Sequence, residues 1–455
     1  MLVDALRNDF VFGDKSEMHF TRSLLKSGKA MGFTARATAP TVTMPRVKAL
    51  TTGTVPSFLD AVLNIAESDT SSSLAHYDNI LWQLKHQGKK KINLFGDDTW
   101  IRLFPGIFSR TDGTSSFFVT DTVEVDTNVT RNVKPELLRN DWGVTIFHYL
   151  GLDHIGHLGG PDSPLMGPKQ KEMDSVVKTI YDIITKQDME RKSENPDSKS
   201  TLFVLLGDHG MNFAGNHGGS SHGETSTTLV FMDKDMDFGP SDKPLSALLD
   251  KTLPQVNFAS TISLLFGVPI PINNIGYPIM ELLDQQSGPE RLRSLQLCTH
   301  QIYKLLATND NVKDMLDPSD IKQFDRVDCA DISGKDDKII CHYAKSLVNH
   351  GKYLSTGSDI YLRQAQASYQ ETLLITNSYL SESFSNYNFT AMFSGMGLMS
   401  LAVLGFLFLR FWEEGWSSEA TESTKLFRYF DQSIFWTFIV LYPTYSMLLR
   451  EPSTA

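Results

Sequence analysis

Short apolar runs that end in acidic or histidine residues are the feature that most constrains the fold of this chain. The runs suited to strands buried on both faces are Ile92–Phe95, Val144–Leu150, Leu202–Leu206 and Leu229–Met232. Segments able to form crossover helices, such as Ser57–Ile65 and Met173–Thr185, lie between them. Apolar strands that alternate with helices are typical of a parallel sheet covered by helices on both faces. We therefore predict an α/β domain over residues 1–285, with a mostly parallel sheet sandwiched by helices, and a solvated loop at Lys186–Ser200.

The predicted strands carry carboxylates and imidazoles where they end. These strand-end residues are Asp4, Asp97, Asp98, Asp153, His157, Asp208 and His209. In an open parallel sheet, ligands bind outside the carboxyl ends of the strands, so we expect the side chains to share one crevice. A single strand-end Asp is often only a helix N-cap, but this explanation does not cover several strand ends at once. A mixture of carboxylate oxygen and imidazole nitrogen suits zinc or a similar divalent ion.

A hydroxyl group near the start of a predicted helix is the candidate nucleophile. Pro45 suits the first turn of a helix, which leaves Thr43 near the cap, with its hydroxyl facing the positive end of the helix. An ordinary threonine N-cap explains the same pattern without any catalysis. The residues alone leave both interpretations open.

Composition excludes two classes of protein. The 455 residues include 42 Lys+Arg and 53 Asp+Glu, a formal net charge of −11, whereas nucleic-acid-binding proteins usually present a basic face. Three cysteines, Cys298, Cys329 and Cys341, are too few for a scaffold that disulfides hold together. Cys329 and Cys341 could close a short loop in an oxidising compartment, which would leave Cys298 free, but the pairing cannot be read from the sequence.

The rest of the chain has a helical pattern followed by an apolar one. Residues 286–390 predict a charged helical stalk or cap that leads to a membrane. Residues 391–412 carry no charge before Arg410 and predict a transmembrane helix, with a buried core helix as the alternative. Residues 434–449 are a shorter candidate for a second span. Because no signal-peptide pattern precedes the first strand and few residues follow these spans, we expect a shortened form of a longer protein.

Six motifs, in order, resemble those of the glycosylphosphatidylinositol (GPI) ethanolamine phosphate transferases, which belong to the alkaline phosphatase superfamily of two-metal enzymes. The motifs are DALRNDF from Asp4, PTVTMPRVKALTTG around Thr43, GDDTW from Gly96, HYLGLDHIGH from His148, GDHGM from Gly207 and GNHGGSSHGETS from Gly215. The resemblance covers about the first 280 residues. It implies an alkaline-phosphatase-like fold there, followed by the helical segment and one or two transmembrane helices.

The resemblance also implies which residues form the site. It assigns one divalent ion to Asp153, His157 and His217, and a second to Asp4, Asp208 and His209 with Thr43 as a further ligand. Zinc is the expected metal, and Thr43 is the expected nucleophile. Asn64 is expected to donate to a phosphate oxygen, and Asp97 and Asp98 to bind the ammonium group of the substrate. His154, one step off the ligand face, is expected to pack or to support the ligands.

The implied activity is transfer of phosphoethanolamine from phosphatidylethanolamine to a mannose of the GPI precursor, through a phospho-threonine at Thr43. The pieces HYLGLDHIGH and GDDTW favour the second mannose. The implied partners are both lipids, the membrane and a small stabilising membrane subunit. Basic residues after the first span place the catalytic domain in the lumen of the endoplasmic reticulum. Asn128 and Asn388 begin N-glycosylation acceptor patterns, which suits that location.

Two other functions fit the same residues. A phosphodiesterase for nucleotides or lipids would use the same site, with water in place of the mannose hydroxyl. An inactive, truncated form that binds a partner subunit would need none of this chemistry. The motif string favours the transferase over the phosphodiesterase, and the complete ligand set disfavours the inactive form.

Overall fold

The computed structural model describes residues 1–56, 73–74, 77–240, 243–306, 327–385 and 389–416, and for residues 382–385, 389–393 and 410–416 it describes the backbone alone. The chain divides into two compact units, Met1–Ser381 and Glu382–Ala455, which are described separately below. The predicted crossover helix at Ser57–Ile65 lies outside the described residues.

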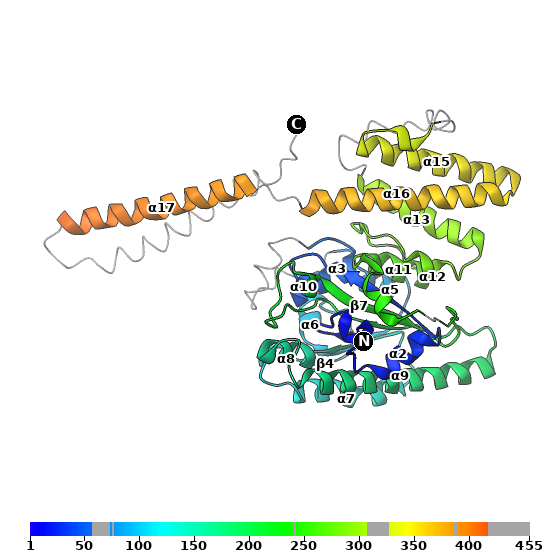
Figure 1. Ribbon diagram of the computed structural model, residues 1–455, viewed down its shortest axis with the longest axis horizontal. Helices are drawn as coiled ribbons and strands as arrows, with labels where there is room; N and C mark the ends of the chain where they lie inside the picture. Colours follow the sequence, from blue (N-terminus) through cyan, green and yellow to red (C-terminus); the bar gives the residue numbers. More distant parts are fainter. Residues whose placement is uncertain (57–72, 75–76, 241–242, 307–326, 386–388, 417–455) are drawn as a thin grey trace. The chain divides into compact units, whose positions relative to one another are not determined.

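Eight strands of the described part of the chain form one sheet, in the order β4-β3-β5-β1-β6-β7-β2-β8 (Figure 1). They are β1 (Leu2–Val3), β2 (Ala30–Arg36), β3 (Ile92–Asp97), β4 (Arg110–Thr114), β5 (Val144–Tyr149), β6 (Phe203–Leu206), β7 (Ser226–Met232) and β8 (Thr252–Pro254). All pairings are parallel except those that β7 makes with β6 and β2. The prediction of a mostly parallel sheet is therefore confirmed.

The predicted direction of one strand is wrong. The run Leu229–Met232 lies in β7, which is antiparallel to both of its neighbours. Every residue of β7 is buried, so its composition is the same as that of a parallel strand covered on both faces. Strand direction depends on the connections that enter and leave the strand, and a run of apolar residues does not record them.

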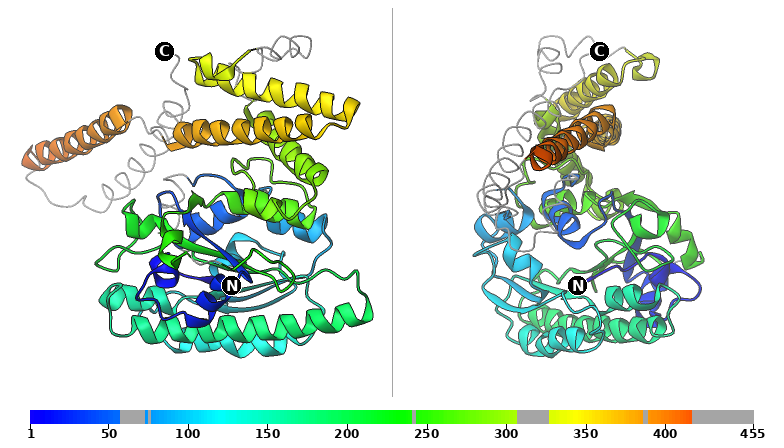
Figure 2. Two further views of the ribbon diagram at one scale, coloured as in Figure 1. Left: turned by 45° about the vertical axis from the view of Figure 1, so that its right-hand side comes forward. Right: turned by 90° about the vertical axis from the view of Figure 1, so that its left-hand side faces the viewer.

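Helices cover both faces of the sheet, as Figures 1 and 2 show. One face carries α1 (Asp9–Phe12), α2 (His19–Lys26), α7 (Glu124–Leu137), α8 (Gly151–Gly159) and α9 (Met166–Glu194). The other face carries α3 (Thr43–Thr52), α5 (Ile80–His86), α6 (Thr99–Leu103), α11 (Asn257–Phe266) and α12 (Met280–Leu283). Successive strand residues enter opposite cores: Leu94 of β3 packs in the second core and Phe95 in the first. Two short helices, α10 (His222–Thr225) and the 3₁₀ helix η2 (Leu245–Leu249), lie in the connections around β7.

Helix α9 contains the predicted helix Met173–Thr185 and continues into the segment that was expected to be a loop. It ends at Glu194, so the solvated loop predicted at Lys186–Ser200 is wrong over its first half. Gln187 and Asp188 are buried in this stretch. The Asp188 carboxylate accepts hydrogen bonds from the backbone N–H and the hydroxyl of Thr201. This tertiary contact explains why a highly charged sequence stays helical.

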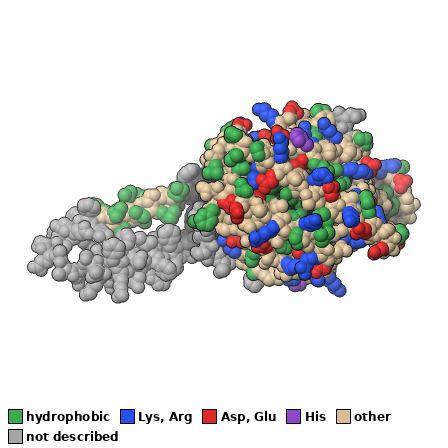
Figure 3. Space-filling model, turned by 90° about the horizontal axis from the view of Figure 1, so that it is seen from below, with side chains coloured by type: hydrophobic (Ala, Val, Ile, Leu, Met, Phe, Trp, Pro, Cys, Tyr) green, Lys and Arg blue, Asp and Glu red, His purple; other side chains and the backbone are tan. Residues whose placement is uncertain are grey.

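The α9 face carries charges of both signs. Viewed from below, Lys and Arg side chains are interspersed with Asp and Glu side chains over this face (Figure 3). Two of the pairs lie one helical turn apart on α9, Lys178 with Asp182 at 2.6 Å and Lys186 with Glu190 at 3.9 Å. Mixed charges of this kind give a solvated surface and not a basic patch for a polyanion.

A helical segment follows the α/β part within the first unit. It consists of α13 (Gly288–Leu306), the 3₁₀ helix η4 (Cys329–Asp331), α15 (Lys335–Thr356) and α16 (Asp359–Ser385). The helical character predicted for this part of the chain is thus present in α13, α15 and α16. A third core joins this segment to the α/β part, because Ala49 and Val256 pack with Leu295 and Tyr369. The predicted division at residue 285 stays a prediction.

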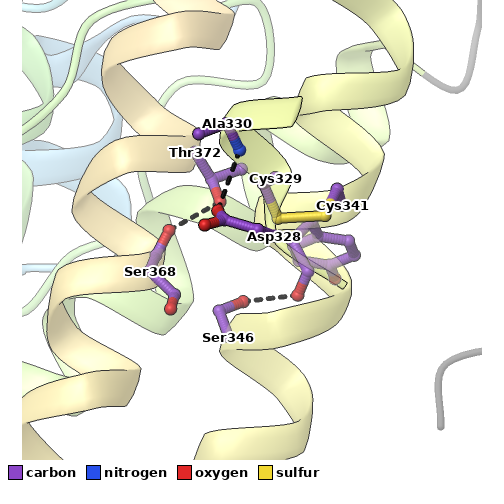
Figure 4. Close-up of a disulfide and its surroundings, with 8 residues drawn as sticks. Asp328, Cys329, Ala330, Cys341, Ser346, Ser368 and Thr372 are labelled. Carbon is purple, nitrogen blue, oxygen red and sulfur yellow. Dashed lines mark hydrogen bonds between the residues drawn. A yellow bond between two sulfur atoms is a disulfide. The ribbon is translucent and has the colours of Figure 1, made fainter. Parts of the chain in front are cut away.

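The pairing of the cysteines, which the sequence left open, is settled in the structure. Cys329 and Cys341 form a disulfide with a Cα–Cα distance of 5.7 Å, whereas Cys298 is free and buried. Figure 4 shows the surroundings, where the Asp328 carboxylate accepts a hydrogen bond from the backbone N–H of Ala330 at 3.0 Å. The disulfide therefore joins η4 to the first turns of α15.

The second unit contains α17 (Phe389–Trp416). Among the described residues, no helix meets the combined requirement of length and apolar character for crossing a bilayer. The transmembrane helix at residues 391–412 stays a prediction, and the candidate span at residues 434–449 lies outside the described part of the chain.

Gly53 ends helix α3 and provides a test of how that helix is held. Its φ is +72°, and a Cβ atom built there would lie 2.0 Å from Oδ1 of the buried Asn274. We expect Gly53→Ala to lower the free energy of unfolding by more than the ~1–2 kcal/mol that a left-handed backbone costs a residue with a Cβ. Gly106→Ala is the matched control, since Gly106 has φ +73° and no atom within 4 Å of the added Cβ. Urea denaturation measures both variants, and equal losses would exclude a contribution from Asn274.

Candidate active site

The four strand ends that were expected to share a crevice are adjacent in the sheet. Strands β3, β5, β1 and β6 are consecutive in the strand order. Asp97 is the last residue of β3, Asp4 follows β1, and Asp208 lies two residues beyond β6. Helix α8, which starts directly after β5, carries Asp153 and His157. The parallel order therefore brings these side chains to one edge of the sheet.

Asp4, Asp208 and His209 form the first potential ligand group, and all three are almost fully buried. The His209 Nε2 atom lies 3.2 Å from Asp4 Oδ1 and 3.5 Å from Asp208 Oδ2. The other ring nitrogen, Nδ1, lies 3.0 Å from the carbonyl oxygen of Gly210, which can only accept a hydrogen bond. In the neutral ring Nδ1 must carry the hydrogen, so the Nε2 lone pair faces the two carboxylates.

Asp153, His157 and His217 form the second group. Asp153 and His157 lie one turn apart on α8, with 3.3 Å between Asp153 Oδ2 and His157 Nε2. His217 Nε2 lies 3.1 Å from His157 Nε2 and 3.7 Å from Asp153 Oδ1. The Nδ1 atom of His217 donates to the carbonyl oxygen of Thr41 at 2.9 Å, so the Nε2 lone pair points into this group. The group is less buried than the first, with 28% of the His157 side chain exposed.

His209 connects the two groups. Its ligand atom also lies within metal-binding range of Asp153 and His217, and its ring stacks on that of His217 with 4.1 Å between centroids. Burial would lower the pKa of His209, but Asp208 and Asp4 outweigh burial and raise the pKa to about 10. Burial and the neighbouring Asp4 raise the pKa of Asp208 to about 6. The carboxylates thus require positive charge at this point, which a proton on His209 or a cation can supply.

The residues fit divalent cations. Three carboxylate oxygens that face the two groups are buried and accept no hydrogen bond within the described part of the chain: Asp4 Oδ1, Asp153 Oδ1 and Asp208 Oδ2. A buried carboxylate oxygen without a partner is costly unless a cation neutralises it. Imidazole nitrogen with carboxylate oxygen is a donor set for zinc or a similar ion.

The Thr43 hydroxyl faces the first group. Its Oγ1 donates to Asp4 Oδ2 at 3.2 Å and lies 3.4 Å from His209 Nε2. Thr43 is the first residue of α3, and Val42 occupies the N-cap position, so the Thr43 side chain does not cap the helix. Thr41, by contrast, is fully buried and holds the His217 loop, because its hydroxyl donates to the carbonyl oxygen of Gly219.

The other predicted site residues lie in neither group. Asn64 and Asn388 fall outside the described part of the chain, whereas Asp97 lies near Asp4. Asp98 pairs with Arg102 at 3.1 Å, and Asp97 is 1% exposed, so the geometry gives an ammonium-binding role for Asp97 no support. The Nδ1 atom of His154 donates a hydrogen bond to the carbonyl oxygen of Asp121 at 2.6 Å, and His154 belongs to neither group.

Asn128, the remaining predicted glycosylation site, lies on α7 and is half-buried. The hydroxyl of Thr130, the third residue of its acceptor pattern, contacts the hydroxyl of Tyr149 at 3.3 Å. Glycosylation there stays a prediction.

A buried arginine, which the sequence analysis missed, ties the helix that carries Thr43 to the loop that carries Asp208. Arg46 is fully buried on α3, and its Nε donates to Oε1 of Gln255 at 2.9 Å. Gln255 in turn donates through Nε2 to the carbonyl oxygen of Asp208 at 2.6 Å. Burial lowers the pKa of Arg46 to about 9, against the opposing effect of Asp208. The only signal in the sequence was an arginine one turn after Thr43, in a helix that is otherwise buried.

Comparisons with known proteins agree with the resemblance found in the sequence. Residues 1–222 match the family described as type I phosphodiesterase / nucleotide pyrophosphatase. The chain is 54% identical over 289 residues to GPI ethanolamine phosphate transferase 2 of Aspergillus fumigatus, which covers 62% of this chain and 36% of that protein. It is 39% identical over 414 residues to the protein of the same name from Yarrowia lipolytica, covering 89% and 43% respectively. The resemblance to GPI ethanolamine phosphate transferases is thereby confirmed.

The chain spans less than half the length of these relatives, 36% and 43%. Among solved structures, a protein of the alkaline phosphatase superfamily from Vibrio parahaemolyticus matches with a TM-score of 0.43 and 17% identity, covering 61% of this chain and 68% of that one.

The ligand groups predict the metal content of the protein. Wild-type protein should carry close to two divalent ions per chain. His217→Ala should lose the ion of the second group, because the substitution removes the Nε2 atom that faces this group. Asp208→Ala should lose the ion of the first group. His222→Ala is the matched control, since His222 is exposed on the neighbouring α10, where its Nε2 atom lies 3.5 Å from the Ser226 hydroxyl. Elemental analysis of the folded proteins provides the measurement, and wild-type protein that is folded but free of metal would contradict the assignment.

Proposed function

We propose that this chain transfers phosphoethanolamine from phosphatidylethanolamine to a mannose of the GPI precursor, the second mannose, through a phospho-threonine at Thr43. The observation that carries the proposal is the position of the Thr43 hydroxyl, which donates to Asp4 Oδ2 at 3.2 Å beside two groups of acidic and histidine ligands. The transferred group and the GPI acceptor come from the name that the relatives carry, whereas the lipid donor and the mannose are what the motif resemblance implies.

The two ligand groups would hold two zinc ions, with Asp153, His157 and His217 around one and Asp4, Asp208 and His209 around the other. When bound, such ions withdraw charge from phosphate oxygens and favour ionisation of a nearby hydroxyl. The chain itself fixes the direction of attack. The Arg46–Gln255 contact holds the start of α3 against the Asp208 loop, so that Thr43 Oγ1 stays over Asp4.

The reaction then takes place as two displacements at phosphorus. Thr43 Oγ1 forms a bond to phosphorus, its proton passes towards Asp4 Oδ2, and the bond from phosphorus to the diacylglycerol oxygen breaks. Diacylglycerol leaves after its oxygen takes up the proton that Thr43 gave. The mannose hydroxyl oxygen next bonds to phosphorus and gives its proton towards Asp4 Oδ2, the bond from phosphorus to Thr43 Oγ1 breaks, and Thr43 Oγ1 takes up that proton. A side chain held in place makes each step effectively unimolecular.

Exposed aromatic side chains support a lipid donor. Phe117, Phe118 and Phe213 are 67%, 66% and 88% exposed, and they lie in the loops that follow β4 and β6 at the edge of the sheet that carries the site. The loop after β4 contacts α8 through Asp121 and His154. Large apolar groups on a soluble surface commonly mark contacts with proteins or membranes.

The proposal includes a location in the endoplasmic reticulum membrane, with the catalytic part in the lumen and a small membrane subunit as partner. The Cys329–Cys341 disulfide supports this location, because disulfides persist in oxidising compartments. Residues 391–412 and 434–449 would lie in the bilayer, and Asn128 and Asn388 would carry glycans. Asn64 would donate to the transferred phosphate.

A phosphodiesterase is the second candidate, favoured by the family description matched over residues 1–222. The two functions share the first displacement and differ in the second, where water at about 55 M competes with the mannose hydroxyl. Positioning gives effective molarities of about 10⁵ M or more, which is enough for a held hydroxyl to win.

Mass spectrometry of the Thr43 peptide tests the mechanism. After incubation with phosphatidylethanolamine labelled in the ethanolamine, wild-type protein should carry label on Thr43, and Thr43→Ala should carry none. Thr52→Ala is the matched control, because Thr52 lies at the far end of α3 and its hydroxyl donates to the carbonyl oxygen of Lys48. Label that is lost in Thr41→Ala but kept in Thr43→Ala would show that the nucleophile is misassigned. Rapid hydrolysis of nucleotide diesters without label from the lipid would favour the phosphodiesterase.

A further inference from the structure

Asp4, the residue that accepts from Thr43, also faces a fully buried histidine outside the two ligand groups. His148 is the fifth residue of β5, 0% exposed, with its Nε2 atom 3.5 Å from Asp4 Oδ2. Asp4, Asp97 and His148 lie close enough together to form a third potential metal group. The chemistry of the other ring nitrogen decides whether His148 binds metal.

Trp100 occupies the lone pair of His148 Nδ1. The indole nitrogen Nε1 of Trp100 lies 2.9 Å from His148 Nδ1, and an indole N–H can only donate. His148 Nδ1 must therefore accept, which leaves the hydrogen of the neutral ring on Nε2. A nitrogen that carries hydrogen cannot bind a metal ion. The Nε2–H group therefore faces Asp4 Oδ2 across 3.5 Å, close enough for an electrostatic contact although the two atoms form no hydrogen bond, and His148 is not a third metal ligand.

We propose that Trp100 and His148 are positioning residues, which act in series to fix the Asp4 carboxylate for both the metal and Thr43. The inference rests on the metal centre of the proposed function. Asp4 follows a strand of two residues and therefore has little local structure to orient its side chain. The His148 ring is fixed in turn, since it meets the Trp100 ring edge-on with 6.3 Å between centroids. Loss of a partner that orients a metal ligand typically costs 10- to 100-fold in metal affinity.

The zinc affinity of variants of the full chain, measured by competition with a chromophoric chelator, tests this arrangement. His148→Leu removes the Nε2–H group and should weaken binding of zinc by about 10- to 100-fold. His148→Gln places an amide N–H near the position of the imidazole Nε2–H and should restore most of the affinity. Trp100→Phe frees the ring to place its lone pair against Asp4, so it should also weaken binding. Trp82→Phe, on α5 against His86, is the matched control.

Coupling between the two residues separates a relay from simple loss of packing. If Trp100 acts through His148, the double variant Trp100→Phe/His148→Leu should bind zinc no more weakly than His148→Leu alone. Unchanged zinc affinity in a folded His148→Leu or Trp100→Phe, or additive losses in the double variant, would overturn the inference. If His148→Leu does not fold, the zinc affinities of Trp100→Phe and His148→Gln still test whether the two residues position Asp4. Wild-type protein that binds no zinc would remove the metal centre itself, whereas zinc-binding wild type with unaffected variants would remove this inference alone.

Discussion

Negative charge buried at the edge of the sheet is the constraint on which the rest of the site depends. Asp4, Asp97, Asp153 and Asp208 lie at the ends of four adjacent strands, and each is at most 7% exposed. Burying ionised groups is costly unless hydrogen bonds and opposite charge compensate for the lost hydration. His148 and His209 each turn Nε2 towards Asp4, at 3.5 Å and 3.2 Å. The local structure is thus organised to receive positive charge, and the Thr43 hydroxyl lies beside that charge.

Helix α3 carries Thr43, and polar contacts hold the helix at both ends. At its start, Arg46 reaches Gln255 and through it the carbonyl oxygen of Asp208. At its end, the Gly53 carbonyl oxygen accepts from the backbone N–H of Ile275 at 2.9 Å. Asn274, next in the chain, accepts through its carbonyl oxygen from Gln301 of α13 at 2.9 Å. The helical segment after the α/β part therefore contributes to the position of Thr43, although none of its described residues belongs to the two ligand groups.

The features that the sequence predicted are those in which chemistry follows directly from chain order. Polar residues placed just after apolar runs must lie at strand ends, so Asp4, Asp153 and Asp208 could be grouped before any contact was known. The direction of β7 could not be predicted, because a strand buried on both faces has one composition in either direction. The role of His148 depends on which ring nitrogen meets Trp100, a fact that only packing determines. The helix through Asp188 likewise depends on a contact with Thr201.

Strand β1 has a consequence for the order in which the molecule can be assembled during synthesis. It joins β4-β3-β5 to β6-β7-β2-β8, since Leu2 pairs with His148 on one side and with Leu206 on the other. Once β1 has been synthesised, it must therefore wait for about 200 more residues before the sheet closes around it, and at ~5–20 residues per second this takes on the order of 10 seconds or longer. During that interval β1 and its acidic neighbour remain without their partners. Because long-range pairing is slow, the nascent chain is open to aggregation for longer than a fold with local pairings would be.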